Sequence, residues 1–138
     1  MSHQEKFQIT TRGRGFYNLD KKVSAIVAGA MIVTGLCHIY IPHTSASIII
    51  SENADPTVLT DLESFMNRLV PDGDSIFKHT AEGDDDMPAH IRSVLTQSAV
   101  SIPIMNHSLA LGTWQGIFLW EHRFKPHSRT VIVTILGH

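Results

Sequence analysis

Side chains that bind metals and transfer protons gather in one stretch of the chain, from Ile76 to Gln97. Imidazoles and carboxylates do both kinds of chemistry, and this stretch combines them at short spacing. It contains His79, Glu82, Asp84, Asp85, Asp86, His90 and Arg92. Gly83 and Pro88 indicate a bent, loop-like backbone that can aim several of these groups at one place. The alternative is a solvated acidic turn ahead of a capped helix.

The spacing of four of these residues bears on where they lie. His79, Glu82, Asp86 and His90 would share one face of a continuous helix. The glycine and proline among them disfavour such a helix, so we expect His79 at a strand end and His90 in the first turn of a helix. His43 follows a proline at the junction of two apolar strands, where it can project into a cleft.

His43, His79 and His90 together predict a metal site. Three protein ligands with one open position are the arrangement of a catalytic zinc site. We expect a divalent ion, zinc ahead of magnesium, because histidine favours zinc whereas carboxylates favour magnesium. The spacing is not that of the HExxH motif. The alternative is that the histidines are hydrogen-bonded within a polar network.

A second set of residues could contact a substrate. The segment LGTWQGIFLWEHR has the alternation of a strand, with Trp114 offering either a stacking surface or simple core packing. The predicted substrate-binding residues are Ser45, Asn53, Thr113, Trp114, Gln115 and Glu121. The predicted catalytic residues are His79, Glu82, Asp86 and Arg92. Arg92 would place positive charge near a phosphate group.

Composition bounds the classes of protein that this chain can be. Its 138 residues suit one domain, residues 1–138, and 43% hydrophobic with 17% charged residues is ordinary for a globular protein. A net charge of −2 without a basic arm argues against nucleic-acid binding. The single cysteine, Cys37, permits no internal disulfide and fits a reducing cytosol. The apolar run Val23–Leu36 is shorter than the ~20 residues that span a bilayer, so we expect a cytoplasmic protein that does not enter membranes.

The hydrophobic pattern predicts helices and strands in a mixed order. We expect helices over residues 20–30, capped by Asp20, over 56–69, capped by Asp55, and over 88–97, capped by Asp86 or Met87. We expect strands near residues 4–11, 99–105, 113–123 and 130–136, and two more between 32 and 50, with a turn over residues 12–15 that leads into a short segment over 16–18. Consecutive strands joined by short turns predict an α+β fold with a mostly antiparallel, sandwich-like core.

Three blocks of the sequence resemble those of a known family. PHTSASIIISENADPTV, KHTAEGDDDMPAHIRSVL and LALGTWQGIFLWEHR are similar, in this order, to the motifs of the YjbQ-type family, the secondary thiamine-phosphate synthases. The positions that match its pattern are His43, Asn53, His79, Glu82, Asp86, His90 and Gly112 to Gly116. The resemblance implies a small sheet-rich α+β protein assembled as a homotrimer.

The resemblance also implies an activity. Some members of the family can join a pyrimidine diphosphate to a thiazole phosphate and release pyrophosphate, so we expect a small phosphorylated substrate. Two other functions fit the same residues. One is a metal-dependent hydrolase of a small phosphorylated compound, and the other is a trimeric metal- or metabolite-binding module without catalytic activity.

Overall fold

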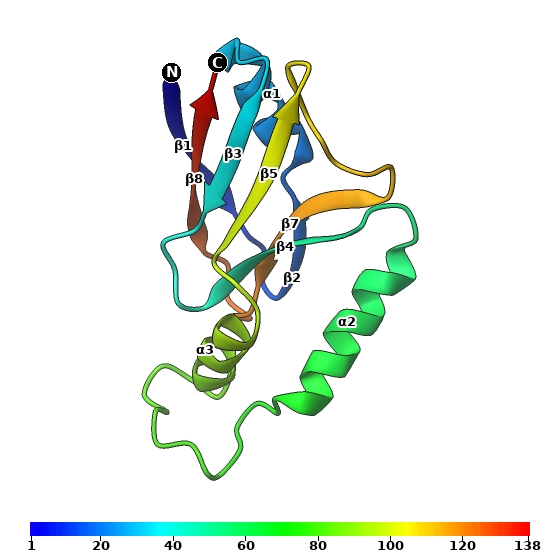
Figure 1. Cartoon of the computed structure of the whole chain (residues 1–138). Helices are drawn as coiled ribbons and strands as arrows, with labels where there is room; N and C mark the ends of the chain where they lie inside the picture. The colour runs from blue at the N-terminus through cyan, green and yellow to red at the C-terminus, as the bar shows by residue number, and fades with distance from the viewer.

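Two antiparallel sheets form the frame of the molecule, and the computed structural model describes all 138 residues (Figure 1). The larger sheet has the strand order β1-β8-β3-β5-β6, and the smaller has the order β2-β7-β4. The strands are β1 (Ser2–Thr10), β2 (Gly15–Asn18), β3 (Gly35–Tyr40), β4 (Ala46–Glu52), β5 (Ala99–Met105), β6 (Ser108–Leu109), β7 (Gln115–Glu121) and β8 (Ser128–Gly137). The predicted α+β class with mostly antiparallel strands is confirmed.

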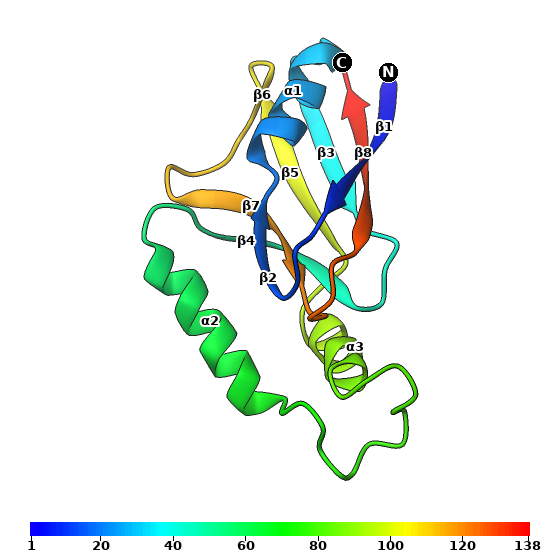
Figure 2. The ribbon, with the colours of Figure 1, turned by 180° about the vertical axis from the view of Figure 1, so that it is seen from behind.

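The register of the larger sheet follows from its alternating side chains. On β3, Cys37 and Ile39 are buried whereas His38 and Tyr40 are exposed, as period-two patterning requires. β8 pairs with β1 on one side and with β3 on the other. The β1–β8 pairing, in which Ser2 faces Leu136, brings the two termini together (Figure 2).

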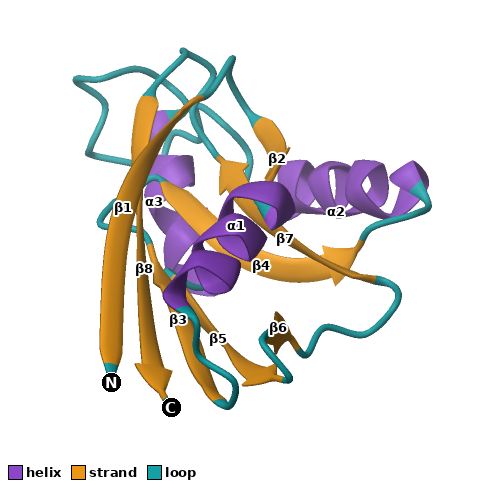
Figure 3. Ribbon diagram, turned by 90° about the horizontal axis from the view of Figure 1, so that it is seen from above, coloured by secondary structure: helices purple, strands orange, loops and turns teal.

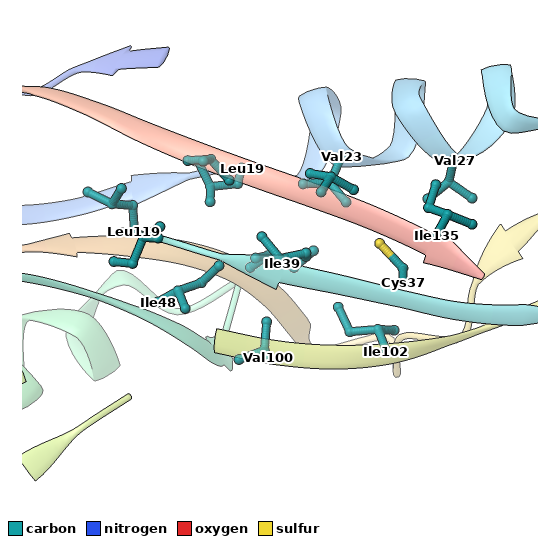
Figure 4. Close-up of a cluster of buried hydrophobic side chains, with 14 of the residues drawn as sticks. Leu19, Val23, Val27, Cys37, Ile39, Ile48, Val100, Ile102, Leu119 and Ile135 are labelled. Atoms are coloured by element: carbon teal, nitrogen blue, oxygen red, sulfur yellow. The ribbon is translucent and has the colours of Figure 1, made fainter. Parts of the chain in front are cut away.

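A single large core lies between the two sheets. Its side chains come from β3, β5 and β8 of the larger sheet and from β4 and β7 of the smaller, so neither sheet buries this core alone (Figure 4). Ile39, Val100 and Ile135 meet Ile48 and Leu119 there. Burial raises the pKa of the Cys37 thiol, also in this core, to about 11, so Cys37 acts as an apolar packing residue.

Helix α1 (Asp20–Ala30) closes this core by packing Val23 and Val27 into it (Figure 3). Its N-cap residue is Leu19, so the prediction that Asp20 caps the helix is wrong by one position. The Asp20 carboxylate instead accepts the backbone N–H of Ile117 in β7, at 2.8 Å. The residue thus joins α1 to the smaller sheet.

Helix α2 (Pro56–Leu69) has the cap that the sequence predicts, because Asp55 accepts the backbone N–H of Thr57. The helix lies along the outer side of the smaller sheet (Figure 1). There Met66 forms a second small core with Trp120 of β7. Strand β7 is therefore covered on both faces, by the main core and by α2.

Helix α3 (Asp86–Leu95) begins two residues before the predicted start. The 16 residues between α2 and α3, numbers 70–85, contain no strand, so the prediction that His79 lies at a strand end is wrong. Gly83 has a φ of 111° in this loop, a conformation that side-chain-bearing residues rarely adopt. The turn at Gly83 leads directly into α3 and brings His79 back beside it.

No helix of the protein combines the length and the hydropathy that a bilayer crossing requires.

Candidate functional site

The first turns of α3 and the loop before it build one open cluster of metal-ligating atoms. The Nε2 atom of His79 lies 2.7 Å from Oδ2 of Asp86, and Nε2 of His90 lies 3.3 Å from the same oxygen. We call His79, Asp86 and His90 the histidine–aspartate cluster; their ligating atoms all lie within 4.8 Å of one another. The Asp86 side chain is 2% exposed but that of His79 is 51% exposed, so one side of the cluster faces solvent.

The proton positions of His90 follow from its partners. Its Nδ1 lies 3.0 Å from the backbone carbonyl oxygen of Thr44. A carbonyl can only accept, so Nδ1 carries a hydrogen and, in the neutral ring, Nε2 is a bare lone pair. That lone pair faces the Asp86 oxygen at 3.3 Å. Two acceptors this close repel each other unless a proton or a metal ion lies with them.

Arg123, at the end of β7, holds Asp86 in place. Its NH1 donates to Oδ1 of Asp86 at 2.8 Å, its Nε donates to Asp85 at 3.0 Å, and its NH2 donates to the backbone oxygen of Glu82 at 2.8 Å. Because Oδ1 of Asp86 is occupied, Oδ2 alone is presented to the two imidazoles. A second group that orients a ligand in this way is typical of metal sites. Arg123 lies 37 residues from Asp86 in the sequence, so no local spacing indicated this contact.

These contacts keep both aspartates ionised. Burial raises the pKa of Asp86, but its hydrogen bond with His79 and the charge of Arg123 outweigh burial and hold the pKa below its ordinary value. For Asp85, burial is likewise outweighed, by hydrogen bonds from Phe124 and Arg123, so its pKa is also lowered. A carboxylate that stays ionised can bind a cation at neutral pH.

Two concavities flank the histidine–aspartate cluster. A polar one of about 150 Å³ lies beside His79 and is lined mainly by the preceding loop, including Asp74, Thr80 and Asp84. An apolar one of about 270 Å³ runs along α3. We call it the α3 groove; its lining residues are Met87, His90, Ile91, Val94 and Leu95. His79 therefore opens onto the polar cavity and His90 onto the apolar groove.

The structure does not bring His43 into the cluster, which corrects the predicted three-histidine site. Its Nε2 accepts the backbone N–H of Thr130 at 2.8 Å. Burial first, and then the charge of Arg129, lower the pKa of His43. Asp86 takes the third position instead, so two imidazoles and one carboxylate replace three imidazoles. His43 stays near the site only through its neighbour Thr44, which accepts from His90.

Arg92 is also misplaced by the sequence prediction. Its side chain is fully buried, with NH1 donating to Glu63 at 2.6 Å and NH2 to Asn67 at 2.5 Å, both on α2. A guanidinium committed to α2 cannot reach a phosphate at the surface. Arg123 is the arginine that contacts the cluster.

Two predicted substrate-binding residues belong to a buried ion pair. Glu121 is fully buried and bonded to Arg129 and Thr11. Burial raises the pKa of Glu121, but the hydrogen bonds from Arg129 and Thr11 outweigh it and lower the pKa. The hydroxyl of Ser45 accepts from Arg129 at 3.0 Å. Both side chains bond to Arg129 of β8, and neither lines the two cavities beside the cluster.

The other predicted substrate-binding residues shape one loop, residues 110–114, which we call the Trp114 loop. The amide of Asn53 donates to the carbonyls of Thr113 and Gln115, and the Gln115 side chain accepts from Gly112. Trp114 itself is 62% exposed. The loop lies beside the start of α2, whereas α3 lies towards its other end (Figures 1 and 2). One chain therefore does not unite the two predicted halves of the site.

A second network, built around His122 and not indicated by any sequence pattern, lies beneath α3. The Thr96 hydroxyl donates to the backbone oxygen of Arg92, so the Ser47 hydroxyl must donate to Thr96. Ser47 then accepts from Nε2 of His122 at 2.7 Å, which leaves Nδ1 of His122 without a hydrogen or a partner. We call Ser47, Thr96 and His122 the buried histidine network.

Two imidazole nitrogens and one carboxylate oxygen are a donor set that zinc and non-haem iron both accept. Their separations, the lone pair of His90 and the support of Asp86 by Arg123 all fit a divalent ion. Such a cluster on an antiparallel frame defines the chain as a small α+β protein with an open, metal-capable histidine–carboxylate site.

Comparison with known proteins places the chain within a family. The model of the YjbQ-like UPF0047 proteins matches residues 5–138. The UPF0047 protein of Synechocystis is 54% identical over 98% of this chain and 92% of its own length, and YjbQ of Escherichia coli O157:H7 is 38% identical over 99% of both. A solved YjbQ/UPF0047 structure from Clostridium acetobutylicum covers 96% of this chain and 99% of its own, with 34% identity and a TM-score of 0.88. The chain belongs to the YjbQ/UPF0047 family.

Proposed function

We propose that this protein is a metal-dependent enzyme for small phosphorylated compounds, and that it joins a pyrimidine diphosphate to a thiazole phosphate with release of pyrophosphate. The observation that carries the metal-dependent part is the pair of facing acceptors at the cluster. Nδ1 of His90 is committed to the Thr44 carbonyl, so its Nε2 is the nitrogen left to face the ionised Asp86 oxygen, at 3.3 Å, and a divalent cation can take the place of a proton between them. The choice of reaction comes from the family resemblance.

Charge around the cluster explains why a phosphorylated substrate would need the metal ion. Glu82, Asp85 and Asp86 surround the single guanidinium of Arg123, whose nitrogens are already bonded to Asp85, Asp86 and the Glu82 backbone. Anionic oxygens would meet net negative charge there. A divalent ion held by His79, Asp86 and His90 would supply the Lewis-acid charge that phosphate oxygens require.

The residues of the chain would take distinct roles in the displacement. The carbon–nitrogen bond between the rings forms as the carbon–oxygen bond breaks, and pyrophosphate leaves with the bonding electron pair. With Nε2 of His79 in the cluster, its half-exposed ring can donate a hydrogen bond from Nδ1 to the departing oxygens. Glu82, on the rim, can orient a polar group of the substrate. Arg123 positions Asp86 and does not touch the substrate.

Measuring the metal content of the purified protein tests the proposed metal site directly. We expect one zinc ion per chain in protein purified without a histidine tag, and a loss of affinity of at least about 100-fold in Asp86→Asn and His90→Ala, because each removes one of three ligands. His38→Ala is the matched control, since His38 is exposed and bonded only to Ser101 on β5. Equal metal content in wild type and His90→Ala would contradict the proposal.

The reaction is tested with the two phosphorylated halves of thiamine phosphate. Product should form with wild type and His38→Ala, should disappear on chelation, and should be absent with His79→Ala although its far-UV circular dichroism is unchanged. Full turnover by His79→Ala would exclude this site as the catalytic centre.

Hydrolysis of a small phosphorylated compound is the second candidate, and the open side of the cluster favours it. His79 is 51% exposed and the polar cavity beside it is water-accessible, so a water molecule can reach the substrate as nucleophile. A screen of phosphorylated metabolites for phosphate release distinguishes the two reactions, because only hydrolysis proceeds without a thiazole partner.

A further inference from the structure

The loop between β3 and β4 carries His43, a histidine that the histidine–aspartate cluster does not use directly. The two ends of this loop, Ile41 and Ser45, are buried. Between them, Pro42 has no N–H group, and the N–H groups of His43 and Thr44 donate to no backbone carbonyl. A segment with so few backbone hydrogen bonds depends on side chains to hold one conformation.

His43 supplies such a contact, because it ties the loop to β8. Strand β3 ends at Tyr40, which pairs with Ile132 of β8. Thr130 lies two residues past that pair, beyond the end of β3. A backbone N–H of a strand needs an acceptor there. Nε2 of His43 accepts this N–H at 2.8 Å, so the imidazole replaces the strand partner that β3 no longer provides.

Thr44, the next residue, connects this contact to the cluster. Its carbonyl oxygen accepts the hydrogen of His90 on Nδ1, at 3.0 Å. Consecutive Cα atoms are about 3.8 Å apart, so a fixed His43 limits where the Thr44 carbonyl can lie. A series of contacts therefore runs from β8 through His43 and Thr44 to the ring of His90, and so to the nitrogen that faces Asp86.

We propose that His43 is a positioning residue: by holding the Thr44 carbonyl in place, it keeps the hydrogen of His90 on Nδ1 and leaves Nε2 free for a metal ion. The ionised Asp86 oxygen is itself an acceptor, 3.3 Å from Nε2. If the Thr44 carbonyl moves away, the neutral ring can carry its hydrogen on Nε2 and donate it to Asp86, and that nitrogen is then no longer a ligand.

The metal part of this inference rests on the proposed function, whereas the position of the hydrogen on His90 does not. Groups that orient a metal-binding histidine typically contribute about 10- to 100-fold in metal affinity. His43 acts on the ligand through one backbone residue, so we expect an effect near the lower end, about 10-fold.

Zinc affinity in three variants provides the first test. His43→Phe keeps a ring of similar size but cannot accept the N–H of Thr130, so competition titration with a chromophoric chelator should show zinc affinity about 10-fold below wild type. His43→Gln has a side-chain carbonyl that can accept this N–H and should restore the wild-type affinity. His38→Ala, which removes a histidine bonded only to Ser101, is the control and should bind zinc like wild type.

The position of the hydrogen on His90 provides the second test, in metal-free protein. Nitrogen-15 NMR of the imidazole rings, at about pH 8 so that ordinary histidines are neutral, distinguishes the two tautomers. Wild type and His43→Gln should carry the hydrogen of His90 on Nδ1, and His43→Phe should carry it largely on Nε2. A purely structural role of His43 would lower the urea stability of His43→Phe and leave both the tautomer and the zinc affinity unchanged.

The outcomes separate this inference from the proposed function. An unchanged His90 tautomer in His43→Phe would overturn the inference, as would a His43→Gln variant that behaves like His43→Phe. His43→Ala, which also removes the acceptor, repeats both tests if His43→Phe does not fold. Zinc bound equally by wild type and His43→Phe contradicts the inference alone. A wild type that binds no zinc contradicts the proposed metal centre, and the tautomer of His90 still decides the role of His43.

Discussion

Two hydrogen-bond networks that contain histidine lie at α3, and they differ in what surrounds them. In the buried histidine network, hydroxyl groups fix the hydrogen of His122 on Nε2, and its ring has no contact with solvent. In the histidine–aspartate cluster, a backbone carbonyl fixes the hydrogen of His90 on Nδ1 and leaves Nε2 directed at an ionised oxygen beside solvent.

The comparison teaches that the environment, more than the residue type, separates structural from reactive histidines. Burial lowers the pKa of His122 to about 2, and the charge of Arg92 acts in the same direction, so this ring stays neutral. A neutral ring with a fixed hydrogen serves as a packing element. The cluster has an open side, a carboxylate and a free lone pair, which are the requirements for binding a cation.

The largest expected effect separates two neighbours on α3. Arg92→Ala should lower the free energy of unfolding by about 2–4 kcal/mol, because it empties the space of a fully buried side chain and removes its hydrogen bonds to Glu63 and Asn67. His90→Ala should change it by less than about 0.5 kcal/mol, as expected for a solvent-accessible side chain. Urea denaturation of both variants measures the difference. Similar losses in the two would show that the cluster is structural as well.

The next effect concerns the arginine that supports the cluster. Arg123→Gln should weaken zinc binding about 10- to 100-fold, because Asp86 loses the donor that fixes its orientation. Arg129→Gln is the matched control, since Arg129 is also buried but pairs with Glu121. Competition titration with a chromophoric chelator measures both affinities on folded protein. Equal affinities would remove Arg123 from the site.

Lowering the pH should reduce the free energy of unfolding through the buried His122. Its pKa is about 2 in the folded protein and about 6.5 in the unfolded chain, so below pH 6.5 only the unfolded chain binds this proton. The stability that His122 contributes is therefore complete above pH 6.5 and is lost as the pH falls towards 2. At pH 5 the loss is about 2 kcal/mol, from ~1.36 kcal/mol per pH unit.

The variant His122→Gln isolates this contribution from that of the carboxylates. Glutamine can still donate an N–H towards Ser47 but does not titrate. Between pH 7.5 and pH 5, the variant should lose about 2 kcal/mol less stability than wild type in urea denaturation. Parallel pH profiles for the two proteins would mean that His122 is hydrated or charged in the folded state.

Local sequence signals predicted those features that depend on neighbouring residues. The cap by Asp55 and the apolar stripe of α2 needed only the spacing along one helix. Asp86 and His90 lie four residues apart on one helix, and the turn at Gly83 returns His79 to them. This part of the site could therefore also be predicted from the sequence.

Features that depend on how distant elements pack could not be predicted from the sequence. Arg92 and Arg123 are both arginines near acidic residues, and only the position of α2 decides that the first is buried against Glu63. The ring of His43 turns to the backbone of Thr130 because β8 runs beside it in the fold. Val94 and Leu95 of α3 are exposed, although the sequence pattern predicts an ordinary core helix there, because periodicity reveals an apolar face and not the direction in which it points.

The smallest expected effect tests the hydroxyl chain itself. Thr96→Val keeps the shape of the side chain but removes the acceptor of the Ser47 hydroxyl, so the free energy of unfolding should fall by about 1 kcal/mol while zinc affinity stays unchanged. Thr60→Val is the matched control, because Thr60 also donates to the carbonyl four residues before it but is exposed, and its change should stay within about 0.5 kcal/mol. If Thr96→Val altered zinc affinity, the two networks would be coupled through α3, and the separation drawn between a structural and a reactive histidine would fail.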